Sequence, residues 1–340
     1  MKKLKPTEYT YASARIRALE NRMVGRERID HLVEARTADE VLDRLSEYGL
    51  TLPDMEGAPV GEASGAAREA MLLAALRAAY TEAETSTPDP AVFRYFRYPY
   101  DCNNIKAAIK CAIRGIPAGE LLFDFGTVGA DEVEGLLREG KYADFPPSMA
   151  AAIPAAREAY DKTGDPRRID TILDRACYQD MLEAVCATGE EALQGWLAVR
   201  VDLTNILMTL RILRMGMGEV GAAFLAESLL PGGRLPADFL ARAYEAGEDA
   251  LWDGLRRTPY EGLLRVDGDP RPLSALERAA DDLYMEQVRK DAKTPFGASV
   301  VAGYLVGWET AVKNIRIILA AKDAGLPSAV IRERIRLSYV

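Results

Sequence analysis

The chain has 340 residues, of which 49% are hydrophobic and 28% are charged, a balance typical of a globular protein rather than a disordered one. Its formal net charge of −9 argues against a nucleic-acid-binding protein, because affinity for a phosphate backbone comes from clustered Lys and Arg. A chain of this length is expected to form two or three compact units.

The N-terminal segment predicts neither export nor membrane insertion. It begins with basic residues but lacks the apolar run of about 7–15 residues that a signal peptide contains. No segment has the roughly 20 apolar residues of a spanning helix, since charges interrupt even the most apolar region, 203–230. Any association with a membrane would therefore depend on a partner protein.

Strong helix formers dominate the whole chain, and strand-length alternation of β-branched residues is nearly absent. The predicted fold class is therefore all-α. Apolar residues recur at helical spacing in three places, and we expect each set to form the buried stripe of a helix: Ile16, Leu19 and Met23; Met71, Ala74, Ala75 and Ala78; and Ile169, Ile172, Leu173 and Ala176. Clusters of Gly, Pro and small polar residues predict loops at 52–65, 85–90, 163–166, 231–236 and 267–272.

The cysteines and the single histidine do not match a common metal site. Cys102, Cys111, Cys177 and Cys186 contain no C-x-x-C pair, and His31 could complete a zinc set only with an unusual ligand mixture. We expect no metal and no cofactor. We also expect the four cysteines to be buried, reduced thiols of a cytoplasmic protein.

An internal repeat is the strongest signal in the sequence. Three segments align without a gap: DCNNIKAAIKCAIRGIP from Asp101, DLTNILMTLRILRMGMG from Asp202, and AVKNIRIILAAKDAGLP from Ala311. Each contains an Asn followed by Ile, and each has a Gly 11 residues after that Asn. The Asn residues are Asn104, Asn205 and Asn314, and the Gly residues are Gly115, Gly216 and Gly325.

The spacing between Asn and Gly predicts the end of a helix. Eleven residues make about three helical turns, and a Gly just past the last turn can adopt the left-handed conformation that closes a helix. Arg114, Arg214 and Lys322 lie in those last turns, where a cation suits the negative end of the helix dipole.

The repeat predicts three helical units. The Asn residues lie 101 and 109 residues apart, so each copy is a small domain rather than a pair of helices. A second shared helix precedes the later two copies, from Ile169 and from Leu273, with a looser match at 67–80 before the first. We place the repeat units at 1–126, 127–233 and 234–340.

With these motifs the chain resembles the C subunit of the archaeal and bacterial V/A-type rotary ATPases, which corresponds to the d subunit of the eukaryotic vacuolar enzyme. The matching segments are YTYASARIRALENRM, FRYPYDCNNIKAAIKCAIRG and WETAVKNIRIILAAKDAGLPSAVIRERI. The resemblance implies three similar helical domains arranged as a funnel with pseudo-threefold symmetry. It also implies a non-catalytic adaptor on the cytoplasmic face of the membrane, between the rotor ring of proteolipid subunits and the central-stalk subunits D and F. The sequence independently lacks a G-x-x-x-x-G-K-[ST] phosphate-binding loop.

Nine residues are candidates for structural or partner-binding roles: Asp101, Asn104, Lys106, Asp202, Asn205, Arg211, Glu309, Asn314 and Arg316. The two aspartates are interpreted as helix N-caps, or alternatively as interface anchors. The three asparagines are expected to form hydrogen bonds between helices, because a buried amide needs partners. Lys106 and Arg316 would form a basic ring in the funnel with a gap at Leu207. Glu309 would pair with Lys313 one helical turn later.

Two alternative functions remain open from the sequence. The protein could be an α-helical repeat scaffold of another cytoplasmic assembly. It could also be an all-α Mg²⁺-dependent lyase, since Asp281-Asp282 resembles the acidic start of a terpene-synthase metal site, although no second acidic cluster supports that interpretation. The sequence does not distinguish H⁺ from Na⁺ as the transported ion.

Overall fold

The computed structural model describes residues 3–53 and 65–340, and within them it contains helices and no β-strand, which confirms the all-α prediction. The chain forms two compact units. Unit 1 consists mainly of Ala91–Tyr260, and unit 2 combines Leu4–Pro90 with Glu261–Val340. In this described part, no helix has the length and apolar character needed to cross a bilayer. The three repeat units at 1–126, 127–233 and 234–340 are a division by sequence similarity and stay a prediction.

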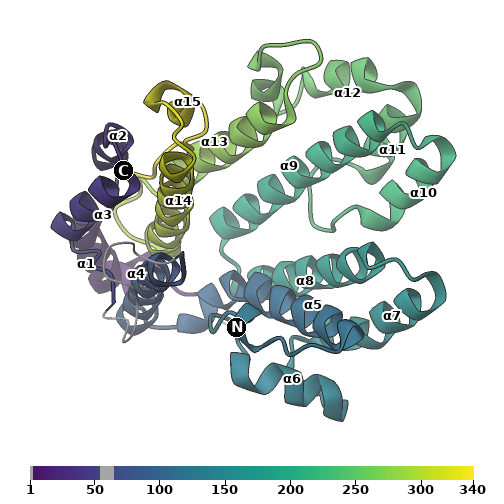
Figure 1. The fold of residues 1–340 in the computed structure, drawn as a ribbon, viewed down its shortest axis with the longest axis horizontal. Coiled ribbons are helices and arrows are strands. Elements are labelled where there is room, and N and C mark those ends of the chain that lie inside the picture. The colour runs from purple at the N-terminus through teal and green to yellow at the C-terminus, as the bar shows by residue number, and fades with distance from the viewer. Residues whose placement is uncertain (1–2, 54–64) are drawn as a thin grey trace. The chain divides into compact units, whose positions relative to one another are not determined.

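Unit 2 is built from segments at both ends of the sequence. Its helices are α1 (Thr10–Glu20), α2 (Arg26–Val33), α3 (Ala38–Glu47), α4 (Gly65–Ser86), α13 (Leu273–Asp291), α14 (Ala298–Asp323) and α15 (Ser328–Arg332), with the 3₁₀ turns η1 (Pro6–Tyr9) and η5 (Glu261–Arg265). The central helix is α14, which contacts α1, α2, α3, α4, α13 and α15 (Figure 1). Its first half, from Ala298 to Trp308, is buried throughout, because neighbouring helices cover it on all sides.

Unit 1 is continuous in sequence. Its helices are α5 (Tyr98–Arg114), α6 (Ala130–Glu139), α7 (Pro147–Thr163), α8 (Arg167–Thr188), α9 (Glu191–Met215), α10 (Gly218–Ser228), α11 (Ala237–Ala246) and α12 (Glu248–Leu255), with the 3₁₀ turns η3 (Gly119–Leu121) and η4 (Tyr142–Asp144). A further turn, η2 (Pro90–Phe96), begins at the junction of the units. Figure 1 shows α7 and α8 as a long pair, with α5 packed on α8.

The repeated glycines end their helices as predicted. Gly115 and Gly216 are the C-caps of α5 and α9, with φ of 69° and 65°, and Gly325 follows α14 by two residues with φ of 67°. No heavy atom lies near the position of a Cβ at any of the three. Glycine is therefore required there for its backbone conformation and not for space.

The predicted loops are confirmed where the structure describes them. Residues 163–166, 231–236 and 267–272 all lie at or between helix ends, and α4 ends within the predicted break at 85–90. Most of the predicted loop at 52–65 lies outside the described residues.

The predicted buried stripe of α4 is confirmed at Met71 but wrong at two of its alanines. Ala74 and Ala78 are exposed, whereas Leu72, Leu76 and Tyr80 are buried beside Met71. The larger side chains remove more apolar surface from water, so they determine which face the helix turns toward α14.

The cysteines are free thiols, and Cys102, Cys111 and Cys177 are buried as expected. Cys186 is exposed, which corrects the expectation for that residue. It lies near the C-terminal end of α8, on the turn that leads out to Gly189.

Candidate functional site

Three asparagines hold the chain in the same way, and we call Asn104, Asn205 and Asn314 the asparagine anchors. The amide of Asn104 donates to the carbonyl oxygen of Phe123 and accepts from its N–H, both at 2.8 Å. Asn205 makes the same pair with Leu230, at 3.0 and 2.9 Å, and Asn314 with Arg336, at 3.0 and 2.9 Å. Their helices are α5, α9 and α14, the same helix of each sequence repeat.

The asparagine anchors close three loops of different length. The bonded residues are 19, 25 and 22 positions apart in the first, second and third copies. Asn104 and Asn314 are completely buried, and Asn205 is 5% exposed. A buried amide that offers one donor and one acceptor to a single backbone residue stabilises a loop that has no regular structure of its own. The expectation that these residues make hydrogen bonds is confirmed, but the partners are loop backbones and not neighbouring helices.

In the first two copies, a buried aspartate also accepts hydrogen bonds from the loop, and we call Asp101 and Asp202 the aspartate braces. Both carboxylate oxygens of Asp101 are used, because Oδ1 accepts from the N–H groups of Thr127 and Val128 at 2.8 and 3.1 Å, and Oδ2 accepts from the Thr127 hydroxyl at 2.8 Å. Asp202 accepts from the N–H groups of Arg234 and Leu235 at 2.9 and 3.0 Å. The hydroxyl of Tyr260 also donates to Asp202.

The N-cap interpretation of these aspartates is wrong. α5 already begins at Tyr98, with Pro99 in its first turn, and α9 begins at Glu191, so Asp101 and Asp202 lie inside their helices. Both are buried, at 1% and 0% exposure, and their carboxylates bind the N–H groups of a distant loop.

Two glycines make room for the aspartate braces. A Cβ on Gly126 would lie 2.1 Å from Oδ1 of Asp101, and a Cβ on Gly233 would lie 2.1 Å from Oδ1 of Asp202. Each glycine is three residues after the residue bound by the asparagine anchor, Phe123 or Leu230, and directly precedes the N–H groups that bind the carboxylate. The first two copies therefore share one design of helix, loop and carboxylate brace.

Burial is the main influence on the pKa values of Asp101 and Tyr260. It raises the pKa of Asp101 above its ordinary value, and the hydrogen bonds from Thr127 and Val128 only partly oppose it. Burial and the hydrogen bond to Asp202 together raise the pKa of Tyr260, so this phenol remains a donor under ordinary conditions.

In the third copy, a tyrosine packed against α14 takes the place of the aspartate brace. Ala311 occupies the aspartate position, and Tyr339 is the third residue after Arg336, where the other copies have glycine. Tyr339 lies directly on α14, since a Cβ on Gly303 or Gly307 would come within 2.8 Å of its hydroxyl oxygen or its Cβ, respectively. Its hydroxyl donates to Glu20 at 3.0 Å.

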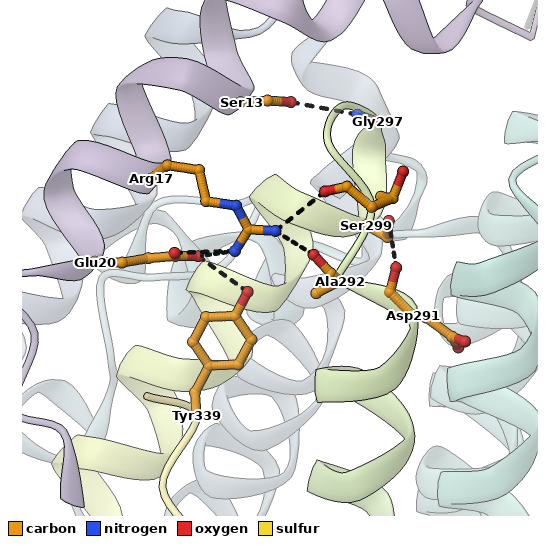
Figure 2. A network of polar contacts seen from close by, with 9 residues as sticks. Ser13, Arg17, Glu20, Asp291, Ala292, Gly297, Ser299 and Tyr339 are labelled. Atoms are coloured by element: carbon orange, nitrogen blue, oxygen red, sulfur yellow. Dashed lines mark hydrogen bonds and ion pairs between the residues drawn. The ribbon is translucent and has the colours of Figure 1, made fainter.

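Figure 2 shows the polar network around Tyr339. Glu20 also accepts from Arg17 at 2.8 and 2.9 Å, and Arg17 donates to the carbonyl oxygens of Ala292 and Thr294 between α13 and α14. In the same loop, the N–H of Gly297 donates to Ser13 at 3.2 Å. The network thereby fastens α1 to the loop before α14 and to the C-terminal segment.

Sequence reasoning missed this network. Arg17 and Glu20 lie in the first segment that carried the family resemblance, and the Gly303–Gly307 spacing on α14 marks a close approach of another chain segment. Neither signal shows which segment approaches.

The two predicted basic residues that follow the asparagine anchors are both paired within their own units. Lys106 lies 2.7 Å from Asp174 on α8, and Arg316 donates to Glu69 on α4, with one bond of 3.0 Å. Burial disfavours the charged form of Lys106. The electrostatic interactions with Cys102 and Asp174 outweigh this effect, so the pKa of Lys106 is raised. Leu207 stands at the equivalent position of the second copy and is buried. The basic ring stays a prediction, and both its cations already neutralise a carboxylate on a neighbouring helix.

The remaining candidates have different surroundings from those expected. Glu309 accepts a hydrogen bond from Tyr80 at 2.7 Å, and Lys313 pairs instead with Asp281 at 2.5 Å, so the predicted Glu309–Lys313 pair is wrong. Arg211 is exposed on α9.

The acidic pair considered for Mg²⁺ binding has structural partners. Asp281 accepts from Lys313 and from Arg336, the latter at 3.0 Å, and Asp282 accepts from the N–H of Leu337 at 2.6 Å. The two carboxylates hold the segment after α15 against α13, which leaves the metal-site interpretation without support.

Comparison with known proteins shows which sequences this chain is similar to. The model of the ATP synthase (C/AC39) subunit family matches residues 12–334. The C subunit of the V-type ATP synthase of Thermus thermophilus is 28% identical over 243 residues, covering 69% of this chain and 71% of that protein. The C subunit of the A-type ATP synthase of Thermococcus onnurineus is 26% identical over 343 residues, covering 97% of this chain and 90% of that protein.

A sodium-ATPase relative is also similar. The C subunit of the V-type sodium ATPase of Enterococcus hirae is 23% identical over 257 residues, covering 75% of this chain and 77% of that protein. The family model covers far more than half of the chain and includes all three asparagine anchors. The protein therefore belongs to the ATP synthase (C/AC39) subunit family.

Proposed function

We propose that this protein is the non-catalytic rotor adaptor of a V/A-type ATPase or ATP synthase, joining the central-stalk subunits D and F to the membrane rotor ring. In this role it acts at the cytoplasmic face of the membrane and contacts the bilayer only through the ring. It carries torque for rotary transport of H⁺ or Na⁺ and has no catalytic site or cofactor of its own. The observation that carries the proposal is the family match over residues 12–334.

The hydrogen-bond geometry supports a mechanical role. A subunit transmits torque efficiently only if its helices and connecting loops are rigid. The three asparagine anchors and the carboxylates of Asp101 and Asp202 tie buried helix positions to backbone groups 19 to 33 residues further along the chain. Loop segments that are held by few hydrogen bonds open at low free energy, so these bonds help to keep the loops in place.

The names of the relatives support the same assignment. They are subunits of V-type and A-type ATP synthases and of a V-type sodium ATPase. These names include a sodium ATPase as well as ATP synthases, so relatives of this chain occur in enzymes of both kinds.

The proposal is tested with purified components from the same organism. The protein is immobilised, and its affinity is measured for the purified D–F stalk complex and, separately, for the detergent-solubilised rotor ring. We expect saturable, stoichiometric binding to each and no ATP hydrolysis by the protein alone. Failure to bind either component would overturn the adaptor role, whereas binding to unrelated cytoplasmic proteins in its place would favour a different scaffold.

A further inference from the structure

Exposed hydrophobic side chains are concentrated at the ends of two repeated helices. The described part of the chain exposes ten large hydrophobic side chains, and six of them lie in 113–123 and 215–220. They are Ile113, Ile116, Leu121 and Phe123 at and after the end of α5, and Met215 and Val220 at and after the end of α9. We call these two segments the apolar tips. A single exposed hydrophobic residue is ordinary on a protein surface, but a group of them marks an interaction site.

The apolar tips occupy equivalent positions in the first two repeats. Each begins in the last turn of its helix and includes the glycine that ends it, Gly115 or Gly216. Both tips belong to unit 1, and Figure 1 shows α5 and α9 running in the same general direction, so the tips lie at the same end of that unit. In the third copy, the exposed Asp323 occupies the position of Ile113, so the end of α14 differs from the other two.

The first apolar tip is held in place although most of it is loop. The backbone of Phe123 makes two hydrogen bonds of 2.8 Å with Asn104, while its side chain is 37% exposed. The N–H of Ala118 also donates to Glu134 on α6. Exposed side chains on a fixed backbone need little further ordering when a partner binds, which favours affinity.

Carboxylates accompany the apolar tips, and bases stand only at the borders. Residues 115–137 contain five carboxylates and no Lys or Arg, and residues 215–233 contain two carboxylates and no Lys or Arg. Arg114 and Arg138 border the first stretch, and Arg214, which borders the second, is paired with Glu248 at 2.7 Å. Beside Val220, the carboxylate of Glu219 is exposed and forms no ion pair with any residue that the structure describes.

We propose that the two apolar tips of unit 1 bind the cytoplasmic face of the membrane rotor ring, each on the same segment of a different proteolipid subunit. This inference rests on the proposed adaptor function, which supplies the ring. A ring of identical subunits presents the same surface repeatedly, so both of the equivalent tips find a matching site on it. The stalk subunits D and F are two different proteins and offer no such repetition. The carboxylates also suit the ring, because cytoplasmic loops of membrane proteins carry an excess of Lys and Arg.

The first experiment measures the affinity of the protein for the detergent-solubilised rotor ring and, separately, for the purified D–F stalk complex. The variants are Leu121→Ser, Val220→Ser and the two combined. These side chains are 57% and 68% exposed, so their replacement leaves the core unchanged, and circular dichroism verifies folding. The matched control is Tyr11→Ser, which removes a 66% exposed aromatic side chain from α1 in unit 2, outside both tips.

Each single variant is expected to weaken binding to the ring by about fivefold or more, and the combined variant by more than either alone, because both tips bind at once. Tyr11→Ser should bind the ring as the unmodified protein does. Affinity for the D–F complex should be unchanged in all variants. Weaker binding to the D–F complex with unchanged binding to the ring would assign the tips to the stalk and overturn the inference, as would unchanged binding to both.

A second measurement tests whether the two tips meet identical sites. Benzoylphenylalanine is placed at position 121 in one variant and at position 220 in another, and each assembled complex is irradiated. We expect mass spectrometry to find both crosslinks on the same cytoplasmic segment of the proteolipid subunit. Crosslinks to D or F, or to two different segments of the ring, overturn the inference while leaving the adaptor role intact. Failure of the unmodified protein to bind the ring at all overturns both.

Discussion

Gly126 and Asp101 are in such close contact that a single added methyl group would separate them. A Cβ on Gly126 would lie 2.1 Å from Oδ1 of Asp101 and 3.0 Å from its Cγ. This oxygen accepts the two backbone hydrogen bonds that fix the loop before α6. Gly126 does not end a helix, but its lack of a side chain allows Asp101 on the preceding helix, α5, to reach these N–H groups.

Gly126→Ala is expected to destabilise the protein by about 2–4 kcal/mol, because Asp101 must move away from the N–H groups of Thr127 and of the buried Val128 and break these hydrogen bonds. Urea denaturation of both proteins measures the difference. The control is Gly135→Ala in the middle of α6, where no atom lies near a Cβ. This control should be neutral or slightly stabilising, because Ala is the better helix former. Equal behaviour of the two variants would contradict the close-contact argument.

The asparagine anchors can be tested with neighbouring residues. Asn104→Ala leaves the N–H and C=O of Phe123 without partners and is expected to cost about 1–3 kcal/mol of unfolding free energy. Asn103→Ala, the adjacent exposed residue of the same helix, is expected to have an effect near zero. Thermal or urea unfolding distinguishes the two, and a comparable loss in Asn103→Ala would mean that the helix and not the anchor is the sensitive element.

Those features of the repeated helices that depend only on residues nearby in the sequence could be predicted. The end of each repeated helix follows from the Asn-to-Gly spacing and the left-handed conformation of glycine, and Gly115, Gly216 and Gly325 are found in that conformation. The need of a buried Asn for hydrogen bonds also follows from its chemistry alone.

The partners of these residues could not be predicted from the sequence. Anchor and partner are 19, 25 and 22 positions apart, so Phe123, Leu230 and Arg336 do not align without gaps. For the same reason the equivalence of Gly126 and Gly233 is hidden until the structure places each beside its aspartate. Asp101 was interpreted as an N-cap because helix periodicity does not reveal that α5 begins three residues earlier, at Tyr98.

The buried carboxyl of Asp101 should give an unusual pH dependence. Burial raises the pKa of Asp101 in the folded protein above its ordinary value. Between the unfolded and folded pKa values the folded state binds more protons, so stability from this group decreases as pH rises through that window. We therefore expect the difference in unfolding free energy between the unmodified protein and Asp101→Asn to decrease as pH rises from about 4. Urea titrations at several pH values measure this difference, and an increase with pH would show that the hydrogen bonds from Thr127 outweigh burial.

The pair Lys106–Asp174 is expected to stabilise the contact between α5 and α8. The Lys106 side chain is only 16% exposed, so its charge is screened less than that of a surface lysine. A double-mutant cycle with Lys106→Met and Asp174→Asn should give a coupling energy of about 1 kcal/mol. The same cycle on the exposed pair Lys162–Glu158 within α7 is the control and should give a much smaller coupling. Equal couplings would contradict a special role for the Lys106 pair.

Tyr339 should determine how firmly the C-terminal segment is held on α14. Tyr339→Phe removes the donor to Glu20, which retains its bonds from Arg17, so a loss of about 1 kcal/mol is expected. Gly307→Ala is expected to act more strongly, because its Cβ would lie 2.8 Å from the Cβ of Tyr339 and would force the whole ring away from the helix.

Hydrogen exchange gives the decisive measurement for the Tyr339 contact. Both variants should speed exchange of the N–H of Arg336, which bonds to Asn314, more than that of Phe123 in unit 1, which bonds to Asn104. Faster exchange at both sites in equal measure would show that the whole chain had lost stability. Faster exchange at Arg336 alone would show that Tyr339 and the asparagine anchor on α14 hold one segment together.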